Sequence, residues 1–445
     1  MSVTITGVQG ALTPAPSKAT LSTNYLGSSI EFTSQYLPDV YEQEFEKYGN
    51  RSVASFLRMV GAEMPFASDV IQWSEQGRLH LAVTGATRQA DVITSNGHPF
   101  RVGQTVIVSD GTDQEKAIVS ATTTNTFTVK SYENANLATA IAASGLKVFA
   151  YGSEFKKGTN GMSGSLEAAK DIQTNNPIII KDKYEVNGSD MAQIGWIEVT
   201  TENGASGYLW YLKSEHETRQ RFEDYLELSL IEGRPAASGS GAASDGYKGT
   251  KGLFYEVENR GNIATGSIAA RTDIEELIKV LDKEGAIQEN VMFVNRTKSF
   301  EIDTVLAAQN NSGASTASYG LFDNDESMAL NLGFQGFNLG YDFYKTDWKY
   351  LNDATTGSLT SAVDGVIVPA GTTTIYDQVL GKNATRPFLH VKYRKSEAED
   401  RKYKSWVVGS AGSAAMSSDL DAMQVHFLSE RALCVHGANN FILLK

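Results

Sequence analysis

The longest helix-like run in the chain is "GYLWYLKSEHETRQRFEDYLELSLIEG", residues 207–233. From Tyr208 onward, apolar and aromatic residues recur at spacings of three and four, which defines one face of an α-helix. About 26 residues with a rise of 1.5 Å each would make a rod of roughly 39 Å. Gly233 and Pro235 are typical stop signals, so the sequence predicts a long helix that ends there. The predicted face consists of Tyr208, Leu212, His216, Arg219, Phe222, Leu226 and Leu230.

His216 and Glu217 in this run look like the first half of a zinc-hydrolase motif. That motif needs a second histidine one helical turn later, because two imidazoles on one face hold the metal. Gln220 occupies that position. The sequence therefore favours a surface histidine on a structural helix over a metal ligand.

Composition and charge narrow the class of protein. The chain has 445 residues, of which 41% are hydrophobic and 20% charged, as in ordinary globular proteins. Its net charge is −13, and no long run of Lys and Arg is present. Specific binding to DNA or RNA is disfavoured, because it needs clustered cations to neutralise phosphates.

Three further features concern the expected compartment. Cys434 is the only cysteine, so no intrachain disulfide can form and a reducing cytoplasm is expected. The first residues lack the basic start and apolar block of a secretory signal. No run of 18 or more apolar residues suggests a membrane span. We therefore expect a soluble protein without a membrane partner.

Other candidate reaction centres also fail at the level of sequence. The glycine-rich stretch 239–252 has Tyr247 where a phosphate-binding loop needs lysine, and Ser244 where a dinucleotide loop needs glycine. Cys434 could pair with His436 or His426, but a buried thiol in a strand is the more common arrangement. The acidic run 323–327 lacks the glycine and final glutamate of a calcium loop. The sequence predicts no catalytic, cofactor-binding or metal-binding residues, and the cofactors are predicted as none.

Residues 88–151 have β-branched runs separated by Asn96-Gly97 and Asp110-Gly111, which are hairpin signals. They predict a small β-barrel or sandwich. The flanks 78–85 and 173–186 look extended, which suggests an insertion at the tip of a long hairpin. Residues 70–85 are predicted to form a strand pair that turns at Gln76-Gly77.

The second half of the chain mixes helices and strands. Residues 272–285 predict a helix with Thr272 and Glu275 as a capping box and Gly285 as its stop. A buried strand at 291–294 and a helix at 297–308 follow. Residues 334–350 are predicted as an aromatic-rich β region, whose rings are expected in a core or a subunit contact more often than in a platform for a sugar or a base. Residues 386–409 are predicted as a hairpin, and residues 421–445 as a long strand with an apolar tail.

The first 36 residues are mostly small and polar, and they cannot bury enough surface to offset their ordering entropy alone. Two readings stay open: a disordered tail, or an arm ordered only against neighbouring chains. Residues 37–62 predict two short helices. An arm, a long hairpin and a long helix without a reaction centre suit a subunit that is stabilised by its neighbours.

The order of these elements resembles the major capsid protein of tailed bacteriophages (the HK97-like fold), and the crAss-like phage group within it. Three segments carry the resemblance: 176–199 as the returning strand of an extended loop, 207–233 as the spine helix and 425–445 as the last long strand. The resemblance implies an α+β fold with an N-terminal arm, an extended loop, a long spine helix and a mixed α/β axial domain, plus an inserted small all-β domain.

The implied domain boundaries follow the chain. They are 1–36 for the arm, 37–87 for the peripheral-domain start and outgoing extended loop, 88–151 for the inserted β-domain, 152–200 for the returning extended loop, 201–245 for the spine helix and peripheral domain, 246–386 for the axial domain, 387–437 for the peripheral long strands and 438–445 for a C-terminal strand into the axial domain.

The resemblance also implies a function. Copies of the chain would form hexamers and pentamers of an icosahedral shell around double-stranded DNA, which they would enclose without specific contacts. Its partners would be portal, scaffolding and auxiliary or decoration capsid proteins. The chain would be located in the virion, which is assembled in the bacterial cytoplasm. The alternatives are a tail-tube or decoration protein, or an enzyme that uses His216 and Cys434.

A shell subunit needs contacts with its neighbours, and twelve residues are predicted to make them. For each, the alternative is a place in the local core or on a solvated surface. The predicted contacts are Tyr25, Tyr36 and Tyr41 in the arm region, Ile178, Ile179, Ile180, Tyr184 and Trp196 in the extended loop, and Arg219, Arg221, Glu223 and Asp224 on the long helix.

Overall fold

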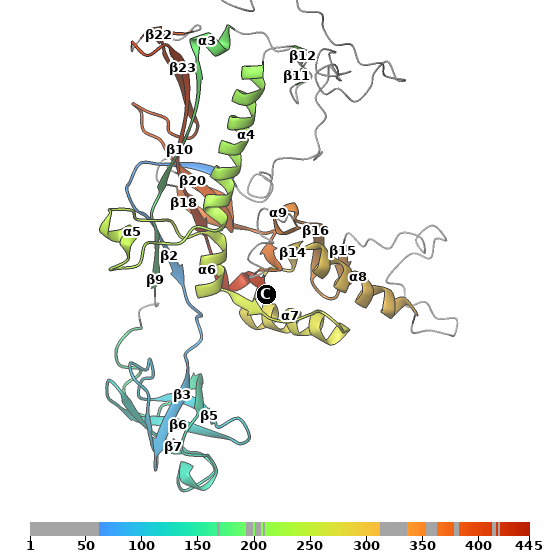
Figure 1. The fold of residues 1–445 in the computed structure, drawn as a ribbon. Coiled ribbons are helices and arrows are strands. Elements are labelled where there is room, and N and C mark those ends of the chain that lie inside the picture. The colour runs from blue at the N-terminus through green and yellow to red at the C-terminus, as the bar shows by residue number, and fades with distance from the viewer. Residues whose placement is uncertain are drawn as a thin grey trace, which may run out of the picture.

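The computed structural model describes residues 62–166, 170–192, 199–200, 206–207, 210–311, 336–352, 363–377, 382–411, 415–416 and 419–445. They contain two six-stranded sheets and a closed six-stranded barrel. The predicted arm, the two helices at 37–62 and the acidic run at 323–327 lie outside these residues. In Figure 1 a mixed α/β region is central, a long sheet with helix α4 (Trp210–Ile231) extends to one side, and the barrel lies on the other.

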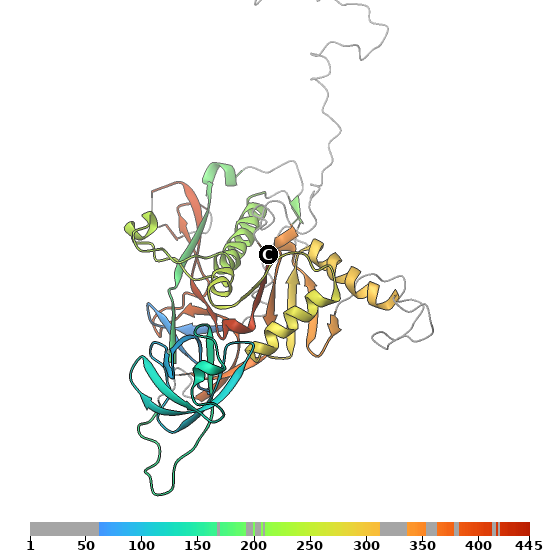
Figure 2. The same ribbon diagram turned by 90° about the horizontal axis from the view of Figure 1, so that it is seen from below.

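The central sheet, called the body sheet here, is covered on both faces. Phe293 points into a core formed with the end of α4 and with α6 (Leu253–Arg260). Met292 and Val294 point into a second core under α7 (Arg271–Glu284) and α8 (Arg296–Asn311), which Figure 2 shows side by side. A strand that is buried on both faces is expected to be continuously apolar, as 291–294 is. The strand order is β13 (Asn262–Ala264), β24 (Ile442–Leu444), β17 (Gly365–Pro369), β14 (Glu289–Val294), β16 (Asp342–Asp347) and β15 (Gly336–Asn338).

The predicted helix at 272–285 is present as α7, but its capping differs from the prediction. Asp273, not Glu275, caps the start: its carboxylate accepts hydrogen bonds from the backbone N–H groups of Ala269 (2.8 Å) and Ala270 (2.9 Å). Glu275 instead pairs with Arg271. Gly285 ends the helix as predicted, with a left-handed φ of 69° that favours glycine.

The second sheet, called the long sheet here, is organised by β23 (Ala422–Val435), a strand of 14 residues. One edge of β23 pairs with β10 (Ile178–Asn187), and the other pairs first with β20 (Leu389–Arg394) and then with β21 (Lys404–Gly409). The prediction of a hairpin at 386–409 is wrong as a pair of neighbouring strands, because β20 and β21 follow one another along the same edge of β23. Antiparallel pairing between the two segments is limited to a bridge between Lys395 and Asp400. The remaining strands are β1 (Ala62–Phe66), which pairs with β20, and β22 (Ala415–Met416), which pairs with β21.

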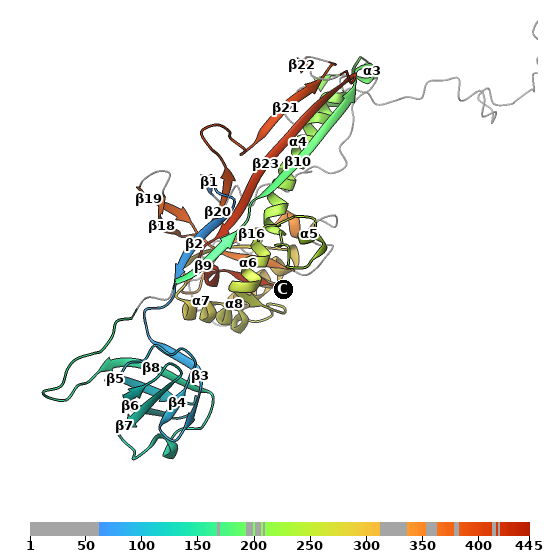
Figure 3. The same cartoon turned by 90° about the vertical axis from the view of Figure 1, so that its left-hand side faces the viewer.

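Helix α4 lies along the long sheet and contacts β10 and β23, as Figure 3 shows. Its buried positions are Thr218, Phe222, Leu226, Glu227, Leu230 and Ile231. Arg219, which was predicted on this face, is exposed, because the buried stripe passes through Thr218 one residue earlier. The side chains of Tyr208 and Leu212 lie outside the described residues.

The end of α4 agrees with the predicted stop signal. The helix ends at Ile231, and a Cβ atom on Gly233 would lie 2.5 Å from the Ser229 carbonyl oxygen. Only glycine fits this close approach without a shift of the backbone. Short elements complete this region and the body: α3 (Gly188–Met191), β11 (Val199–Thr200), β12 (Ser206–Gly207), α5 (Gly241–Ser244), α9 (Lys349–Asn352), β18 (Thr372–Asp377) and β19 (Lys382–Pro387).

The barrel closes in the order β3-β4-β7-β6-β5-β8. It extends beyond the predicted 88–151, because residues 82–85 form part of its first strand. Asp110-Gly111 makes the predicted turn between β5 and β6, whereas Asn96-Gly97 makes no hairpin, since β4 pairs with β3 and β7. The elements are β3 (Ala82–Gln89), β4 (Val92–Thr94), β5 (Gln104–Ser109), β6 (Gln114–Thr122), β7 (Thr126–Ser131), η1 (Leu137–Thr139) and β8 (Leu146–Ser153).

Two antiparallel strands connect the barrel to the body, β2 (Ile71–Gln76) and β9 (Lys170–Asn175). We call this pair the ribbon. The predicted turn at Gln76-Gly77 is wrong, because β2 pairs with β9 and the chain continues from Gly77 into the barrel. Figure 3 shows the ribbon between the long sheet and the barrel.

The barrel has an apolar core that is separate from the other clusters, with Phe127 fully buried in it. Phe127→Ala should remove about 3–5 kcal/mol of stability from the barrel and leave the body unchanged. Differential scanning calorimetry of the full chain should show one transition lowered and another constant. Phe222→Ala, in the core between α4 and the long sheet, is the control and should lower the other transition. A single transition that shifts equally in both variants would contradict this independence.

Candidate assembly surfaces

The residues considered as reaction centres do not form one in the part of the chain that the structure describes. Cys434 is fully buried beside Phe66 and Ala432, and burial raises the pKa of its thiol to about 12. A thiol with that pKa is not a nucleophile at neutral pH. His216 lies half-buried on α4.

The described ranges hold no group of three or more His, Cys, Asp or Glu side chains placed to bind a metal ion. None of their helices is both long and apolar enough to cross a lipid bilayer.

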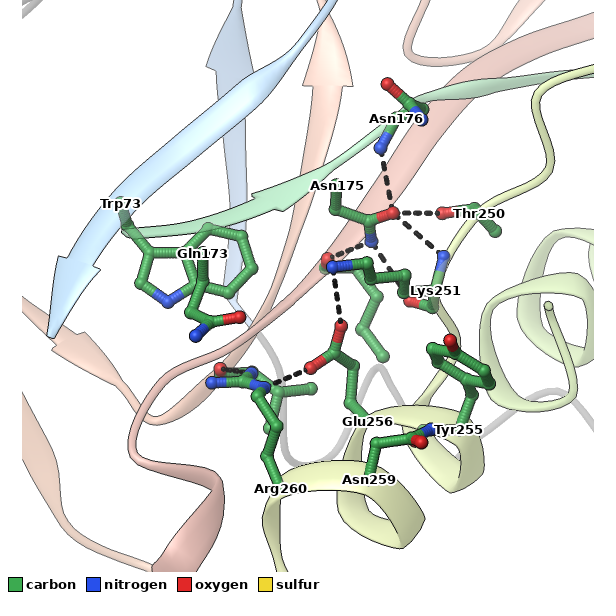
Figure 4. Close-up of polar contacts among 12 residues, drawn as sticks. Trp73, Gln173, Asn175, Asn176, Thr250, Lys251, Tyr255, Glu256, Asn259 and Arg260 are labelled. Carbon is green, nitrogen blue, oxygen red and sulfur yellow. Dashed lines mark hydrogen bonds and ion pairs between the residues drawn. The ribbon is translucent and has the colours of Figure 1, made fainter. Parts of the chain in front are cut away.

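A polar network fixes the ribbon to the body, and Asn175 at the end of β9 is its centre. Asn175 is only 2% exposed. Its amide nitrogen donates to the carbonyl oxygens of Leu433 (2.7 Å) and Lys251 (3.0 Å), and its oxygen accepts from the Lys251 N–H (2.8 Å) and the Thr250 hydroxyl (3.2 Å). Figure 4 shows these contacts. One side chain thus joins β9 to β23 and to the loop before α6.

Arg260 at the end of α6 fixes the other ribbon strand. Its guanidinium donates to both carboxylate oxygens of Glu75 on β2, each at 3.1 Å. It also pairs with Glu256 at 2.5 Å, donates to the Val435 carbonyl at 2.9 Å and lies over the Trp73 ring. A guanidinium with several acceptors in a fixed geometry sets direction as well as distance.

Glu75 is ionised within this network. Burial by itself raises the pKa of Glu75, but hydrogen bonds from Trp73 and the Gly437 N–H, together with Arg260, outweigh it and hold the pKa below its usual value. The carboxylate therefore keeps its charge opposite Arg260 at neutral pH.

His436 completes the network as an aromatic surface. Its ring stacks on His390 with centroids 4.8 Å apart and lies 5.2 Å from the Trp73 ring. Burial lowers the pKa of His436 to about 4, against the opposing charge of Glu75. The ring is therefore neutral at pH 7 and packs against Trp73 as an uncharged group.

No pattern in the sequence indicates this network. Glu75, Asn175, Arg260 and His436 lie far apart in the chain, and each is a single polar residue without a spacing that suggests a partner.

The structure places the four described contact residues of β10 on two faces. Ile180 is buried against α4, and Ile178 and Tyr184 pack partly against the same core. Ile179 points to the opposite face and is 53% exposed. Of this group, Ile179 presents the apolar surface that a neighbour could cover. Trp196 and the three predicted tyrosines of the arm region lie outside the described residues.

The four charged residues predicted on α4 lie along the part of the helix that faces away from the sheet or borders it. Arg219 and Arg221 are exposed, and Glu223 and Asp224 are half-buried. Arg219 lies 3.9 Å from Glu223 and over the Tyr403 ring at 5.9 Å. The sequence predicted their charge pattern, and their role as contacts stays a prediction.

The face of the long sheet opposite α4 carries a row of side chains across three strands. Lys183, His426 and Trp406 lie at one register level. The Trp406 and His426 rings stack at 5.2 Å, and Trp406 is 37% exposed. β10 itself forms an edge of ten residues, and unpaired strand edges attract further strands unless charges such as Lys181 and Lys183 block them.

The ribbon and its connection to the barrel carry strongly exposed apolar side chains. Leu79, in the connection to the barrel, is 86% exposed, and Ile172 on β9 is 57% exposed. A contiguous exposed apolar patch marks a surface that binds a partner, whereas single exposed apolar side chains are ordinary.

Comparisons with known proteins place the chain beside bacteriophage structures. No protein-family model and no curated protein matches the sequence. A structure from Mycobacterium phage Ogopogo is similar over 94% of this chain and 99% of its own, with 8% identity and a TM-score of 0.44. The capsid structure of the cyanophage P-SCSP1u (96% and 98%, 7% identity, TM-score 0.42) and the mature capsid of bacteriophage PhiM1 (97% and 98%, 10% identity, TM-score 0.41) are also similar. Because these TM-scores are below 0.5, the function is inferred below from this chain's own geometry.

Asn175→Ala should destabilise the full chain by roughly 2–4 kcal/mol, because it leaves buried backbone groups on Lys251 and Leu433 without partners. Asn259→Ala is the matched control, since Asn259 is exposed and its amide donates to the Tyr255 carbonyl on its own helix. That control should change stability by less than about 0.5 kcal/mol. Urea unfolding of both variants measures the difference, and equal midpoints would rule out the anchoring role.

Acid should weaken the region around His436. Its pKa is about 4 in the folded chain against an ordinary value of 6.5, so the unfolded chain binds a proton first as the pH falls. Stability should decline between pH 6.5 and 4, by up to about 3 kcal/mol from this group. His436→Phe keeps an aromatic ring but cannot titrate, so its thermal midpoint should fall less over this window. Parallel pH profiles for the two proteins would exclude His436 as a source of the loss.

Proposed function

We propose that this chain is the major capsid protein of a tailed bacteriophage, which assembles into hexamers and pentamers of an icosahedral shell around double-stranded DNA. The supporting observation is that two parts of the chain, the long sheet with α4 and the ribbon with its barrel, extend in different directions from the body (Figure 1). Both carry exposed apolar residues, such as Ile179 and Ile172.

The energetics of the ribbon favour a partner. A two-stranded ribbon is marginally stable alone, since it buries little on either face and leaves both edges without hydrogen bonds. Among the strands that the structure describes, β2 and β9 pair only with each other. Copies of the chain arranged around symmetry axes would cover such elements, because heterologous contacts repeat until a ring or shell closes.

The charge of the chain agrees with enclosing DNA without binding it specifically. A net charge of −13 repels phosphates, so the shell would hold DNA by confinement. The proposal includes portal, scaffolding and auxiliary or decoration capsid proteins as partners, the virion as the location and the host bacterial cytoplasm as the place of assembly. It does not require a catalytic residue.

In this proposal, the parts take the roles that the sequence suggested. α4 is the spine helix, the ribbon belongs to the extended loop, the barrel is the inserted β-domain and the body is the axial domain. The arm tyrosines Tyr25, Tyr36 and Tyr41 and the extended-loop residue Trp196 remain proposed contacts. A tail-tube or decoration protein fits less well, because α4, α7 and α8 make the chain much more helical than β-rich tail proteins.

Negative-stain electron microscopy of the purified full chain tests the proposal directly. Closed shells, or rings of five and six copies, are the expected result, with sedimentation velocity giving matching masses. Compact monomers that persist at high concentration and in the presence of a scaffold would refute it.

A substitution at Ile179 tests the contact surface. Ile179→Asp should prevent or strongly reduce assembly, because a carboxylate would be buried without a partner in the contact. The monomer should remain folded, since Ile179 is exposed and substitutions on exposed positions usually cost less than about 0.5 kcal/mol. Ile179→Val keeps the apolar surface and should assemble normally. Normal shells from Ile179→Asp would remove this residue from the contact.

A further inference from the structure

The outer surface of the barrel carries a shallow groove of about 560 Å³. This volume is within the range of small-molecule sites, roughly 300 to 1,000 Å³. The groove crosses β8, β5 and β6 and reaches the residue after β7. Six side chains give it its chemistry: Thr105, Lys116, Tyr132, Glu133, Tyr151 and Glu154.

Two tyrosine rings are the apolar part of the groove. Tyr132 and Tyr151 are each 48% exposed, although an aromatic ring in a small barrel could be buried in its core. The hydroxyl of Tyr132 donates to the Glu154 carboxylate, and its backbone N–H donates to the Lys116 carbonyl at 3.0 Å. These two bonds hold the Tyr132 ring in place before any ligand arrives, which lowers the entropy cost of binding.

The polar groups around the rings include both hydrogen-bond acceptors and a hydrogen-bond donor. Glu133 and Glu154 supply carboxylate acceptors, Lys116 supplies an ammonium donor, and all three are exposed. A ligand that is rich in hydroxyl groups can donate to the carboxylates and accept from the ammonium at the same time. The aromatic rings offer flat faces to the C–H side of a sugar ring.

We propose that this groove binds an uncharged oligosaccharide, with Tyr151 and Tyr132 as stacking surfaces and Glu133, Glu154 and Lys116 as hydrogen-bonding groups. Nucleic acid fits poorly, because two carboxylates and one ammonium leave the groove negative where phosphates would lie. A purely apolar ligand also fits poorly, because the groove is open and its rim is charged. The site is separate from the ribbon anchor and from the long sheet.

The location supports access by a large ligand. The barrel lies at the far end of the ribbon from the long sheet, as Figures 1 and 3 show, so a polymer can reach it without displacing the body. The inference does not depend on shell assembly, because the groove is formed by the barrel of a single chain.

Saturation-transfer difference NMR of the full chain with maltohexaose, cellohexaose and chitohexaose tests the proposal. Transfer to the ring protons of at least one hexasaccharide is expected. Tyr151→Ala should weaken that binding about tenfold, because it removes one stacking face. Tyr151→Phe keeps the ring and should change the affinity by no more than about threefold. In free energy this is less than half of the loss expected for Tyr151→Ala.

Tyr247→Ala is the matched control. Tyr247 is a tyrosine with 70% exposure in the loop 234–252, outside the groove, and its loss should leave the transfer unchanged. Circular dichroism of each variant confirms that the barrel remains folded. If Tyr151→Ala unfolds the barrel, Glu133→Gln and Lys116→Met provide a second test, since both should weaken binding while the rings stay.

Two results would overturn the proposal. One is the absence of transfer from the wild-type chain to all three sugars. The other is unchanged transfer in Tyr151→Ala. If the chain binds none of the sugars and Tyr151→Ala blocks shell assembly, the groove is a contact between copies of the chain and not a sugar site.

Discussion

Strand β23 is the constraint on which the rest of the structure depends. Its 14 residues pair with β10 on one edge and with β20 and β21 on the other, so its backbone hydrogen bonds join segments from both halves of the chain. After a short turn, η4 (Ala438–Asn440), the chain enters the body sheet as β24 between β13 and β17. Leu433, Val435, Phe441 and Leu443 lie in one core cluster, which means that the two sheets cannot separate without opening it.

The parts that extend from this junction are held in different ways. α4 is held by apolar burial of Phe222 and Leu226 against the long sheet, and the barrel has a core of its own. The ribbon has little apolar burial and depends on Asn175 and Arg260. Hydrogen bonds and ion pairs are directional, whereas apolar contacts tolerate sliding, so the polar anchor fixes the angle at which the ribbon leaves the body.

The candidate surfaces consist of side chains that packing within the chain leaves exposed. Packing within the chain uses Ile180 and Tyr184 and leaves Ile179 and Trp406 on the open face of the long sheet. The barrel, in contrast, buries Phe127 and leaves Tyr132 and Tyr151 outside. Alternation along a strand decides this, because a shift of one residue moves a side chain to the other face. The sequence predicted subunit contacts in the β10 segment. Only the register of β10 in the long sheet shows which of its isoleucines is exposed.

Local patterns determined the elements of this protein. The long helix, the helix α7 with Gly285 at its end, the buried strand β14 and the long strand β23 could all be predicted, because their signals lie within a few neighbouring residues. The tertiary structure decided which strands pair: β2 with β9, which the whole barrel separates in the sequence, and β20 and β21 one after the other along one edge of β23. It also brought Glu75, Asn175, Arg260 and His436 together. Strand pairing and polar networks depend on residues that are distant in the chain. These residues attract one another only when the folded backbone has brought them close, so a single sequence shows no periodic pattern that predicts their contacts.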